Sequence, residues 1–223
     1  MLHRFPPAAL IVGLVLALAA PSAPAIEPPN LSLHKQELLT YVNSGEYAKS
    51  VADVALRANK YLVRRIAKGA KPGKKLAVVF DIDETTLTNL PQILANDFGF
   101  IPKAWDTWIA EGRCPAIFPI QTVYDTAIRG KVDVIFITGR RESDRASTER
   151  NLRQVGYDAW TRIYFKPTTD PTLTTAAFKT DMRRKLTTEG YIIVVNIGDQ
   201  YSDLVNGYAE RTYKLPNPFY RSN

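Results

Sequence analysis

Short apolar runs that alternate with stretches of helical periodicity most constrain how this chain can fold. The runs cover residues 76–80, 132–137, 163–165 and 191–197, and a last short strand is expected at 212–215. Strands that are apolar throughout are buried on both faces of a sheet, and helical connections allow such strands to run parallel. We therefore predict an α/β fold in which a parallel sheet is flanked by helices.

Further elements are expected before the sheet and after its first strand. Two helices are predicted at about residues 33–42 and 47–67, and apolar residues such as Val54 and Ala58 recur at helical spacing in the second. This N-terminal helical extension is expected to pack on the main body. Residues 86–120 are too many for a turn and predict a small insert. Its aromatic residues either wall a pocket or pack on the sheet: Phe98, Phe100, Trp105, Trp108 and Phe118.

The first residues have the pattern of an export signal. Arg4 precedes an apolar run at 8–20, and Ala23-Pro24-Ala25 offers a cleavage site with small residues. The run is shorter than the ~20 residues that span a bilayer, so an uncleaved anchor is the less favoured alternative. We expect a signal peptide over 1–25, a single domain over 26–223, and a periplasmic or secreted protein without stable membrane association after cleavage.

Charge and cysteine content narrow the chemistry only partly. The formal charge of +7 favours anionic partners, which include phosphorylated substrates, nucleic acids and acidic lipids. The basic run at 68–75 lacks a recognisable nucleic-acid motif, so no nucleic-acid partner is expected.

Cys114 is the only cysteine, which excludes an internal disulfide. No Gly-rich loop follows Cys114, so a buried thiol is favoured over a catalytic one.

Three acidic residues follow the first apolar run directly. Asp81 and Asp83 are two positions apart, with Glu84 next to them, so two carboxylates can face one reacting centre from a tight loop. Carboxylates brought together in a dry site repel one another, and a divalent cation offsets that repulsion. Hard oxygen ligands without a nearby Cys or His set favour Mg²⁺. The alternatives are a solvated acidic turn or a helix N-cap.

Two later strands also end in polar clusters. Thr138-Gly139-Arg140 suits a phosphate, because a hydroxyl and backbone N–H groups can donate to its oxygens, although a plain strand-to-helix turn would look alike. Gly198-Asp199 is followed by Asp203, which suits a metal and its supporting residues, or a helix cap at Asp199. Because carboxyl ends of parallel strands share one edge of a sheet, all these clusters are expected to meet there.

Together these segments resemble the haloacid dehalogenase superfamily, and the chain is similar to its acid phosphatase branch, which includes class B and class C acid phosphatases and plant vegetative storage proteins. The resemblance implies a Rossmann-like parallel sheet flanked by helices, the haloacid dehalogenase-like fold. It covers most of the chain after the signal peptide. Its main motifs are Asp81-Ile82-Asp83-Glu84-Thr85, Thr138-Gly139-Arg140-Arg141-Glu142, Gly198-Asp199-Gln200-Tyr201-Ser202-Asp203 and Arg211-Thr212-Tyr213-Lys214-Leu215-Pro216-Asn217-Pro218.

The resemblance also implies roles for particular residues. Asp81 would attack phosphorus and form a phosphoaspartate, while Asp83 would protonate the leaving alcohol and then activate water. Mg²⁺ would be held by Asp81, the backbone carbonyl of Asp83 and Asp199, with Asp203 behind these ligands. Thr138 and Gly139 would bind the phosphate.

A lysine is also implied for the phosphate site. The family has this lysine before its last acidic loop, in a Tyr-Lys-Ser segment that Phe178-Lys179-Thr180 resembles. Lys179 is therefore the preferred candidate. Lys166, at the end of a predicted strand, is the rival.

The predicted activity is hydrolysis of small phosphate monoesters by an acid phosphatase. Phosphotransfer to alcohols would need no other residues, and homo-oligomerisation is left open. A non-enzymatic storage or binding role is an alternative, because plant relatives include storage proteins, but it would be marked by loss of the nucleophile. A phosphorylated signalling receiver is disfavoured, because Asp83 would hasten hydrolysis of a phosphoaspartate that must persist.

Overall fold

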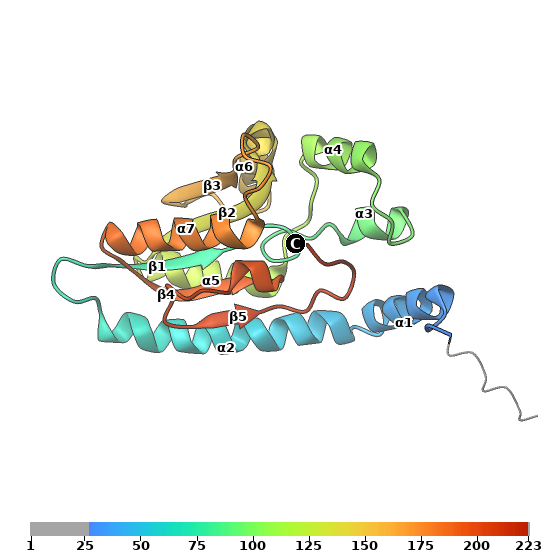
Figure 1. The fold of residues 1–223 in the computed structure, drawn as a ribbon. Coiled ribbons are helices and arrows are strands. Elements are labelled where there is room, and N and C mark those ends of the chain that lie inside the picture. The colour runs from blue at the N-terminus through green and yellow to red at the C-terminus, as the bar shows by residue number, and fades with distance from the viewer. Residues whose placement is uncertain (1–26, 223) are drawn as a thin grey trace, which may run out of the picture.

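The computed structural model describes residues 27–222. One five-stranded parallel sheet has the order β3-β2-β1-β4-β5 (Figure 1). Its strands are β1 Lys75–Phe80, β2 Asp133–Arg141, β3 Arg162–Lys166, β4 Tyr191–Gly198 and β5 Thr212–Lys214. The predicted α/β fold and all its strands are confirmed. The predicted signal peptide lies outside the described residues.

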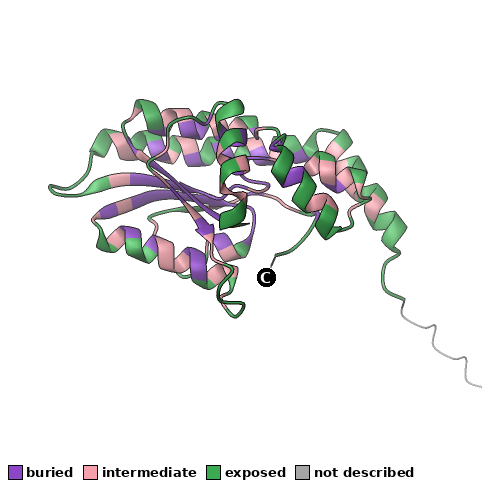
Figure 2. Ribbon diagram, turned by 90° about the horizontal axis from the view of Figure 1, so that it is seen from above, coloured by how far each residue is buried: buried purple, intermediate pink, exposed green. Residues whose placement is uncertain are grey.

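The central strands are buried on both faces. Along β1, Val78 and Phe80 belong to one apolar cluster, whereas Ala77 and Val79 belong to the other. This alternation follows from the pleat of a strand, which sends successive side chains to opposite faces. Figure 2 shows the strands as a largely buried layer between helices with exposed outer sides. The uninterrupted apolar runs of the sequence therefore correspond to a sheet covered on both faces.

Helices cover the sheet on both sides. Helix α2 (Glu46–Lys68) packs against α5 (Phe118–Arg129) on the face where Phe80 lies, and α7 (Thr175–Thr188) covers the other face with Phe178 and Leu186. In Figure 1 the strands β1, β4 and β5 are seen between α7 and α2. Among residues 27–222, no helix combines the length and the apolar character that crossing a bilayer requires.

The N-terminal extension consists of α1 (Leu31–Asn43) followed by α2. The side chain of Asn30 caps α1 by accepting hydrogen bonds from the backbone of Ser32 and Leu33. The predicted apolar stripe of α2 is buried, whereas α1 has no buried residue and lies at the end of α2 (Figure 1). Both helices agree with the sequence to within a few residues, but only α2 belongs to the core.

The insert after β1 contains two short helices, α3 (Leu90–Ala95) and α4 (Pro102–Glu111), each with proline in its first turn. Proline is well suited there because the first N–H groups of a helix have no partner within it. Helix α6 (Arg145–Gln154) packs against α4. In Figure 1 the insert stands beyond the carboxyl ends of the strands, where it can cover a site on that edge.

The strand order brings distant loops together. The chain moves from β1 outward to β2 and β3, then returns to the other side of β1 with β4 and β5. A crevice forms at the carboxyl ends where such an order reverses. Asp81 and Asp199 follow the paired residues of β1 and β4, and the N–H of Asp81 donates to the carbonyl of Ile197 at 3.0 Å. These two acids are neighbours in space for that reason.

Candidate active site

Three buried carboxylates meet at the carboxyl edge of the sheet. Asp81, Asp199 and Asp203 each bring an oxygen within 4.8 Å of the other two. Asp81 follows β1, Asp199 follows β4, and Asp203 ends the 3₁₀ turn Tyr201–Asp203. A Cβ atom at Gly198 would collide with the side chain of Asp203, so glycine is needed for this close approach. The structure thus brings together the acids of two separate sequence clusters.

The side chain of Lys179 lies among these carboxylates. Its ammonium group donates to Asp81 and, at 2.6 Å, to Oδ1 of Asp203. Burial would lower the pKa of Lys179, but the charges of Asp203 and Asp81 outweigh this effect and raise it. Lys179 therefore stays charged. Lys166 ends β3, does not line the cavity described below, and has no ion pair among residues 27–222.

The carboxylates carry more negative charge than Lys179 can balance. Counted by formal charge, three carboxylates and one ammonium sum to an excess of about two negative charges. Burial and the neighbouring Asp203 raise the pKa of Asp199 to about 6. Burial also raises the pKa of Asp81, and the contact with Lys179 only partly opposes it. An excess of this size, presented by hard oxygen donors alone, fits a divalent cation such as Mg²⁺.

Both oxygens of Asp199 are held by hydrogen bonds. Oδ2 accepts from the side-chain amides of Gln200 and Asn217, each at 2.7 Å, and Oδ1 accepts from the hydroxyl of Thr85 at 3.3 Å. Hydrogen bonds of this kind fix the direction of a metal-ligating carboxylate. Asp199 is thus oriented by its own loop, by the loop after β1 and by the C-terminal segment.

The carboxylate of Asp83 points to different partners. It accepts a 2.7 Å hydrogen bond from Nη2 of Arg140 and a 2.9 Å hydrogen bond from Nδ2 of Asn89. Burial raises the pKa of Asp83, but the charge and hydrogen bonds of Arg140 outweigh burial and lower it below its ordinary value. Its side chain is not in the group of three carboxylates, and a role for its backbone carbonyl stays a prediction. Asp203, which we expected behind the ligands, lies directly in that group.

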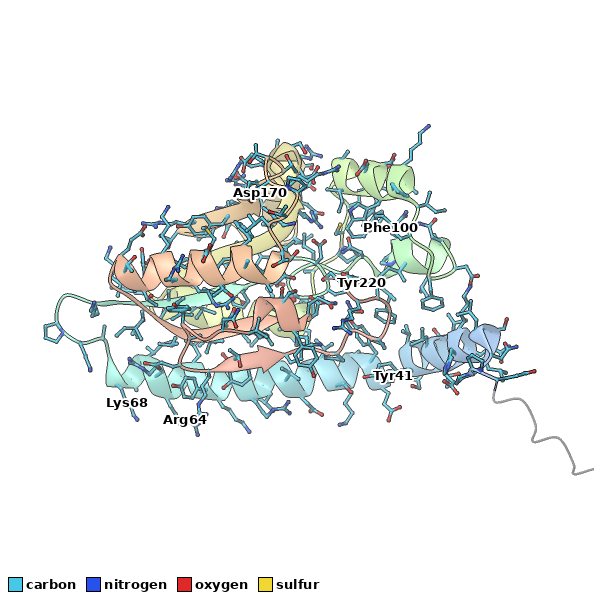
Figure 3. All side chains as sticks on the ribbon, in the orientation of Figure 1. Tyr41, Arg64, Lys68, Phe100, Asp170 and Tyr220 are labelled. Carbon is cyan, nitrogen blue, oxygen red and sulfur yellow. The ribbon has the colours of Figure 1, made fainter. Side chains whose placement is uncertain are left out.

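A cavity of about 710 Å³ opens above these residues. Asp81, Asp83, Lys179 and Asp199 line it, as does Gly139. The rest of its wall includes Phe98, Phe100, Ile101 and Trp105 from the insert, and Phe219, Tyr220, Arg221 and Ser222 from the C-terminal segment. In Figure 3 Phe100 lies on the insert and Tyr220 lies between the insert and the sheet.

Thr138, predicted to bind phosphate, is fully buried and is not part of the cavity wall. Its hydroxyl oxygen accepts a 3.1 Å hydrogen bond from the backbone of Arg140. The hydroxyl hydrogen is still available for donation, because this contact uses only a lone pair.

The aromatic residues of the insert divide between the two roles that the sequence allowed. Phe98, Phe100 and Trp105 line the cavity. Trp108 is nearly buried beside Asn89, and Phe118 is 76% exposed at the start of α5. Cys114 is fully buried, as expected, and burial raises the pKa of its thiol to about 11.

Sequence reasoning missed the partners of Glu84. This side chain is fully buried and accepts hydrogen bonds from the backbone and side chain of Asn89 and from the hydroxyl of Tyr220, the last at 2.5 Å. Burial raises the pKa of Glu84 to about 7. Tyr220 is 136 residues away in the sequence, and no local pattern pairs the two. The only available signal was the C-terminal motif that begins at Arg211.

Comparisons with known proteins agree with this geometry. The family model described as HAD superfamily, subfamily IIIB (Acid phosphatase) matches residues 25–223. The chain is 34% identical over 186 residues to the stem 28 kDa glycoprotein of Glycine max, and the aligned region covers 81% of this chain and 71% of that protein. It is 34% identical over 146 residues to acid phosphatase 1 of Solanum lycopersicum, and here the aligned region covers 64% of this chain and 57% of that protein.

Solved structures show the same similarity. The class C acid phosphatase from Bacillus anthracis superposes with a TM-score of 0.70 and 25% sequence identity, over 86% of this chain and 87% of that one. A structure of that enzyme with tungstate bound gives a TM-score of 0.69 and 26% identity over the same shares. The family inferred from the sequence motifs is thus confirmed. The chain belongs to subfamily IIIB of the HAD superfamily, the acid phosphatases, and this membership makes it a phosphomonoesterase.

Proposed function

We propose that this protein is an exported, Mg²⁺-dependent phosphatase that hydrolyses small phosphate monoesters through a phosphoaspartate on Asp81. One observation carries the proposal: the carboxylate of Asp81 lines the cavity while it contacts the buried ammonium group of Lys179 and lies within 4.8 Å of two further carboxylates. A carboxylate is a competent nucleophile when it is fixed at the floor of a substrate pocket. Export is proposed from the N-terminal pattern alone.

The reaction has two steps at phosphorus. A carboxylate oxygen of Asp81 forms a bond to phosphorus, the bond from phosphorus to the leaving oxygen breaks, and Asp83 gives a proton to that oxygen. Water then attacks the phosphorus of the phosphoaspartate while Asp83 takes one of its protons. The bond from phosphorus to the Asp81 oxygen breaks, which releases inorganic phosphate and restores the Asp81 carboxylate. General acid and base catalysis of this kind contributes about 10²–10⁴-fold to rate. Both Asp81 and Asp83 line the cavity, as the two roles require.

The cation would be held by Asp81 and Asp199, with the backbone carbonyl of Asp83 as a further ligand. When bound, it offsets the negative charge of the carboxylates and of the phosphate. Asp203 lies close enough to contribute a ligand or to hold Lys179 in place. Lys179 and the backbone N–H of Gly139 would bind the phosphate oxygens, and Thr138 would donate its hydroxyl hydrogen from below.

The cavity wall favours an apolar or aromatic leaving group. Phe98, Phe100 and Trp105 line the same cavity as the acids, and aromatic rings bury apolar area and stack on flat groups. Tungstate, which the related Bacillus anthracis structure contains, resembles phosphate in shape and charge and so supports a phosphate group as the part that is bound. Together with the aromatic wall, this leads us to propose aryl or nucleoside phosphates as substrates in preference to short polar esters.

A storage role is the second candidate, since the similar proteins include vegetative storage protein 1 of Arabidopsis thaliana. A storage protein needs no nucleophile, whereas this chain keeps Asp81 in contact with Lys179. Transfer of the phosphoryl group to an alcohol would use the same residues as hydrolysis.

A panel of phosphate esters tests the proposal. The purified protein would be assayed on 4-nitrophenyl, phenyl, nucleoside and glycerol phosphates, with Mg²⁺ and with EDTA, and with an alcohol added to detect transfer. We expect turnover that needs Mg²⁺ and is faster for the aromatic esters. Absence of turnover on every ester with Mg²⁺ would support the storage role instead.

A further inference from the structure

Asn89, a neighbour of Asp83 and Glu84, uses all its side-chain hydrogen-bonding positions. It is fully buried at the start of α3. Its Oδ1 accepts from the indole N–H of Trp108 at 2.9 Å and from the thiol of Cys114 at 3.3 Å. Its Nδ2 donates to Oδ1 of Asp83 at 2.9 Å and to Oε2 of Glu84 at 3.1 Å. A side chain satisfied on every side holds one orientation.

The chemistry of its partners fixes which end of the amide faces Asp83. An indole N–H can only donate, so the amide oxygen of Asn89 must face Trp108. Ionised Asp83 can only accept, so the amide nitrogen must face it. If the amide were turned over, its NH₂ group would face the N–H of Trp108, and its oxygen would face the carboxylate of Asp83. Neither pair could form a hydrogen bond. Trp108 therefore determines that Asn89 donates to Asp83.

The two oxygens of Asp83 have unequal surroundings. Oδ1 accepts from Nδ2 of Asn89 at 2.9 Å and from Nη2 and Nε of Arg140 at 2.7 and 3.1 Å. Within residues 27–222, the one hydrogen bond that Oδ2 accepts is the longer contact from Nε of Arg140, at 3.2 Å. A carboxylate oxygen has two lone-pair positions. Those of Oδ1 are filled, so a proton on Asp83 binds to Oδ2.

Arg140 cannot turn away to release Oδ1. Its Nη1 donates to the buried hydroxyl of Thr148 at 3.0 Å, and the side chain of Arg140 is itself buried. Asp83 is therefore held from two sides, by a cation anchored on Thr148 and by a neutral amide anchored on Trp108.

We propose that Asn89 is a positioning residue that occupies Oδ1 of Asp83, so that Oδ2 carries the proton delivered to the leaving group. This role rests on the proposed function of Asp83 as general acid. As Asp81 bonds to phosphorus, the bond to the leaving oxygen breaks and its electron pair stays on that oxygen. The oxygen takes the proton from Oδ2, which leaves Asp83 as a carboxylate.

The dependence of rate on the leaving group tests this role. A poor leaving group such as an alkoxide needs the proton, whereas 4-nitrophenolate leaves without much help. Asn89→Ser removes the donor to Asp83. We expect it to reduce kcat on benzyl phosphate about 10–100 times more than kcat on 4-nitrophenyl phosphate. In an Asp83→Asn background, adding Asn89→Ser should not change the ratio of kcat on the two esters any further.

Two more variants separate positioning from folding. Trp108→Phe keeps Asn89 but removes the donor that orients it, and we expect the same bias against benzyl phosphate at a smaller size. Asn151→Ser is the matched control, because Asn151 is buried and makes two 2.9 Å hydrogen bonds to the backbone of Cys114 but none to Asp83. Asn151→Ser should change kcat on both esters by the same factor.

Equal losses on the two esters in Asn89→Ser and in Trp108→Phe would overturn the positioning role, even with the wild-type enzyme active. If Asn89→Ser does not fold, the result for Trp108→Phe decides. Failure of the proposed role of Asp83 gives a different result, since Asp83→Asn itself would then lose kcat equally on the two esters.

Discussion

The side-chain amide of Asn217 donates a 2.7 Å hydrogen bond to Oδ2 of Asp199, which connects the C-terminal segment to the carboxylate cluster. Two residues later, Phe219 packs its ring between Tyr47 of α2, at 5.1 Å between centroids, and Phe98 of the insert, at 6.3 Å. The segment after β5 is therefore a part of the site that ties the N-terminal extension and the insert to it.

Removal of this amide should weaken the binding of the cation. Asn217→Ala leaves Asp199 with fewer hydrogen bonds to fix its direction, and the loss of such a partner typically costs 10–100-fold in metal affinity. We expect the Mg²⁺ concentration for half-maximal activity to rise by about that factor. Asn43→Ala, in the exposed end of α1, is the control. An unchanged Mg²⁺ requirement in Asn217→Ala would contradict the inferred support of Asp199.

Without a cation, the acids should destabilise the fold as pH rises. Burial and Asp203 raise the pKa of Asp199 from 3.8 to about 6, so the folded protein binds this proton more tightly than the unfolded chain does. The resulting stability is present below the unfolded pKa and is lost as pH rises through about 6, on the order of 2–3 kcal/mol.

Thermal melts in EDTA and in Mg²⁺ check this sign. In EDTA we expect Tm to fall between pH 4 and pH 7 more for the wild type than for Asp199→Asn. Mg²⁺ should raise Tm more at pH 7 than at pH 4, because it binds the ionised acids. A wild-type protein in EDTA that loses no more stability over this range than Asp199→Asn does would disprove the assignment.

Lys179 should matter far more than Lys166. Lys179→Met leaves buried carboxylates without their cation, which costs about 3–5 kcal/mol of folding free energy. It also removes a charge that stabilises the phosphate, so kcat should fall by at least about 10²-fold. Lys166→Met should resemble the wild type in denaturant melts and in kcat. The reverse pattern would show that Lys166 is the lysine of the site.

Arg140 should set the upper pH limit of the reaction. Burial raises the pKa of Asp83 and Arg140 lowers it below its ordinary value, so the protonated acid is present only at low pH and activity falls as pH rises. Arg140→Gln removes the positive charge and should move this fall to higher pH by about one unit or more. Profiles of kcat against pH on phenyl phosphate measure it, with the half-exposed Arg145→Gln as control. A shift to lower pH would be the wrong sign for this account.

The fold and the meeting of Asp81 with Asp199 could be predicted because they depend on local patterns. Apolar runs locate strands, and the carboxyl ends of parallel strands share an edge, so residues directly after β1 and β4 must be neighbours. The family resemblance added Lys179 to the predicted site, and in the structure its ammonium group contacts Asp81.

The rest of the site depends on packing between distant segments, which no local period encodes. Tyr220 reaches Glu84 only because the chain after β5 crosses to the loop after β1. Asn89 is one polar residue among many in the insert, and its position beside Asp83 follows from Trp108 packing behind it. Asp203 joins the acids because Gly198 has no Cβ to keep it away.

Asp81 as the covalent nucleophile is the central claim, and mass analysis of acid-quenched turnover tests it most directly. The enzyme would be quenched during steady-state hydrolysis of phenyl phosphate with Mg²⁺, and the peptide containing residue 81 examined for an added phosphoryl group. Asp170→Asn, in an exposed loop (Figure 3), is the control. We predict the phosphoryl group on Asp81 in the wild type and the control, and at least ~10³-fold lower turnover in Asp81→Asn. Turnover of Asp81→Asn equal to that of the wild type would contradict the account.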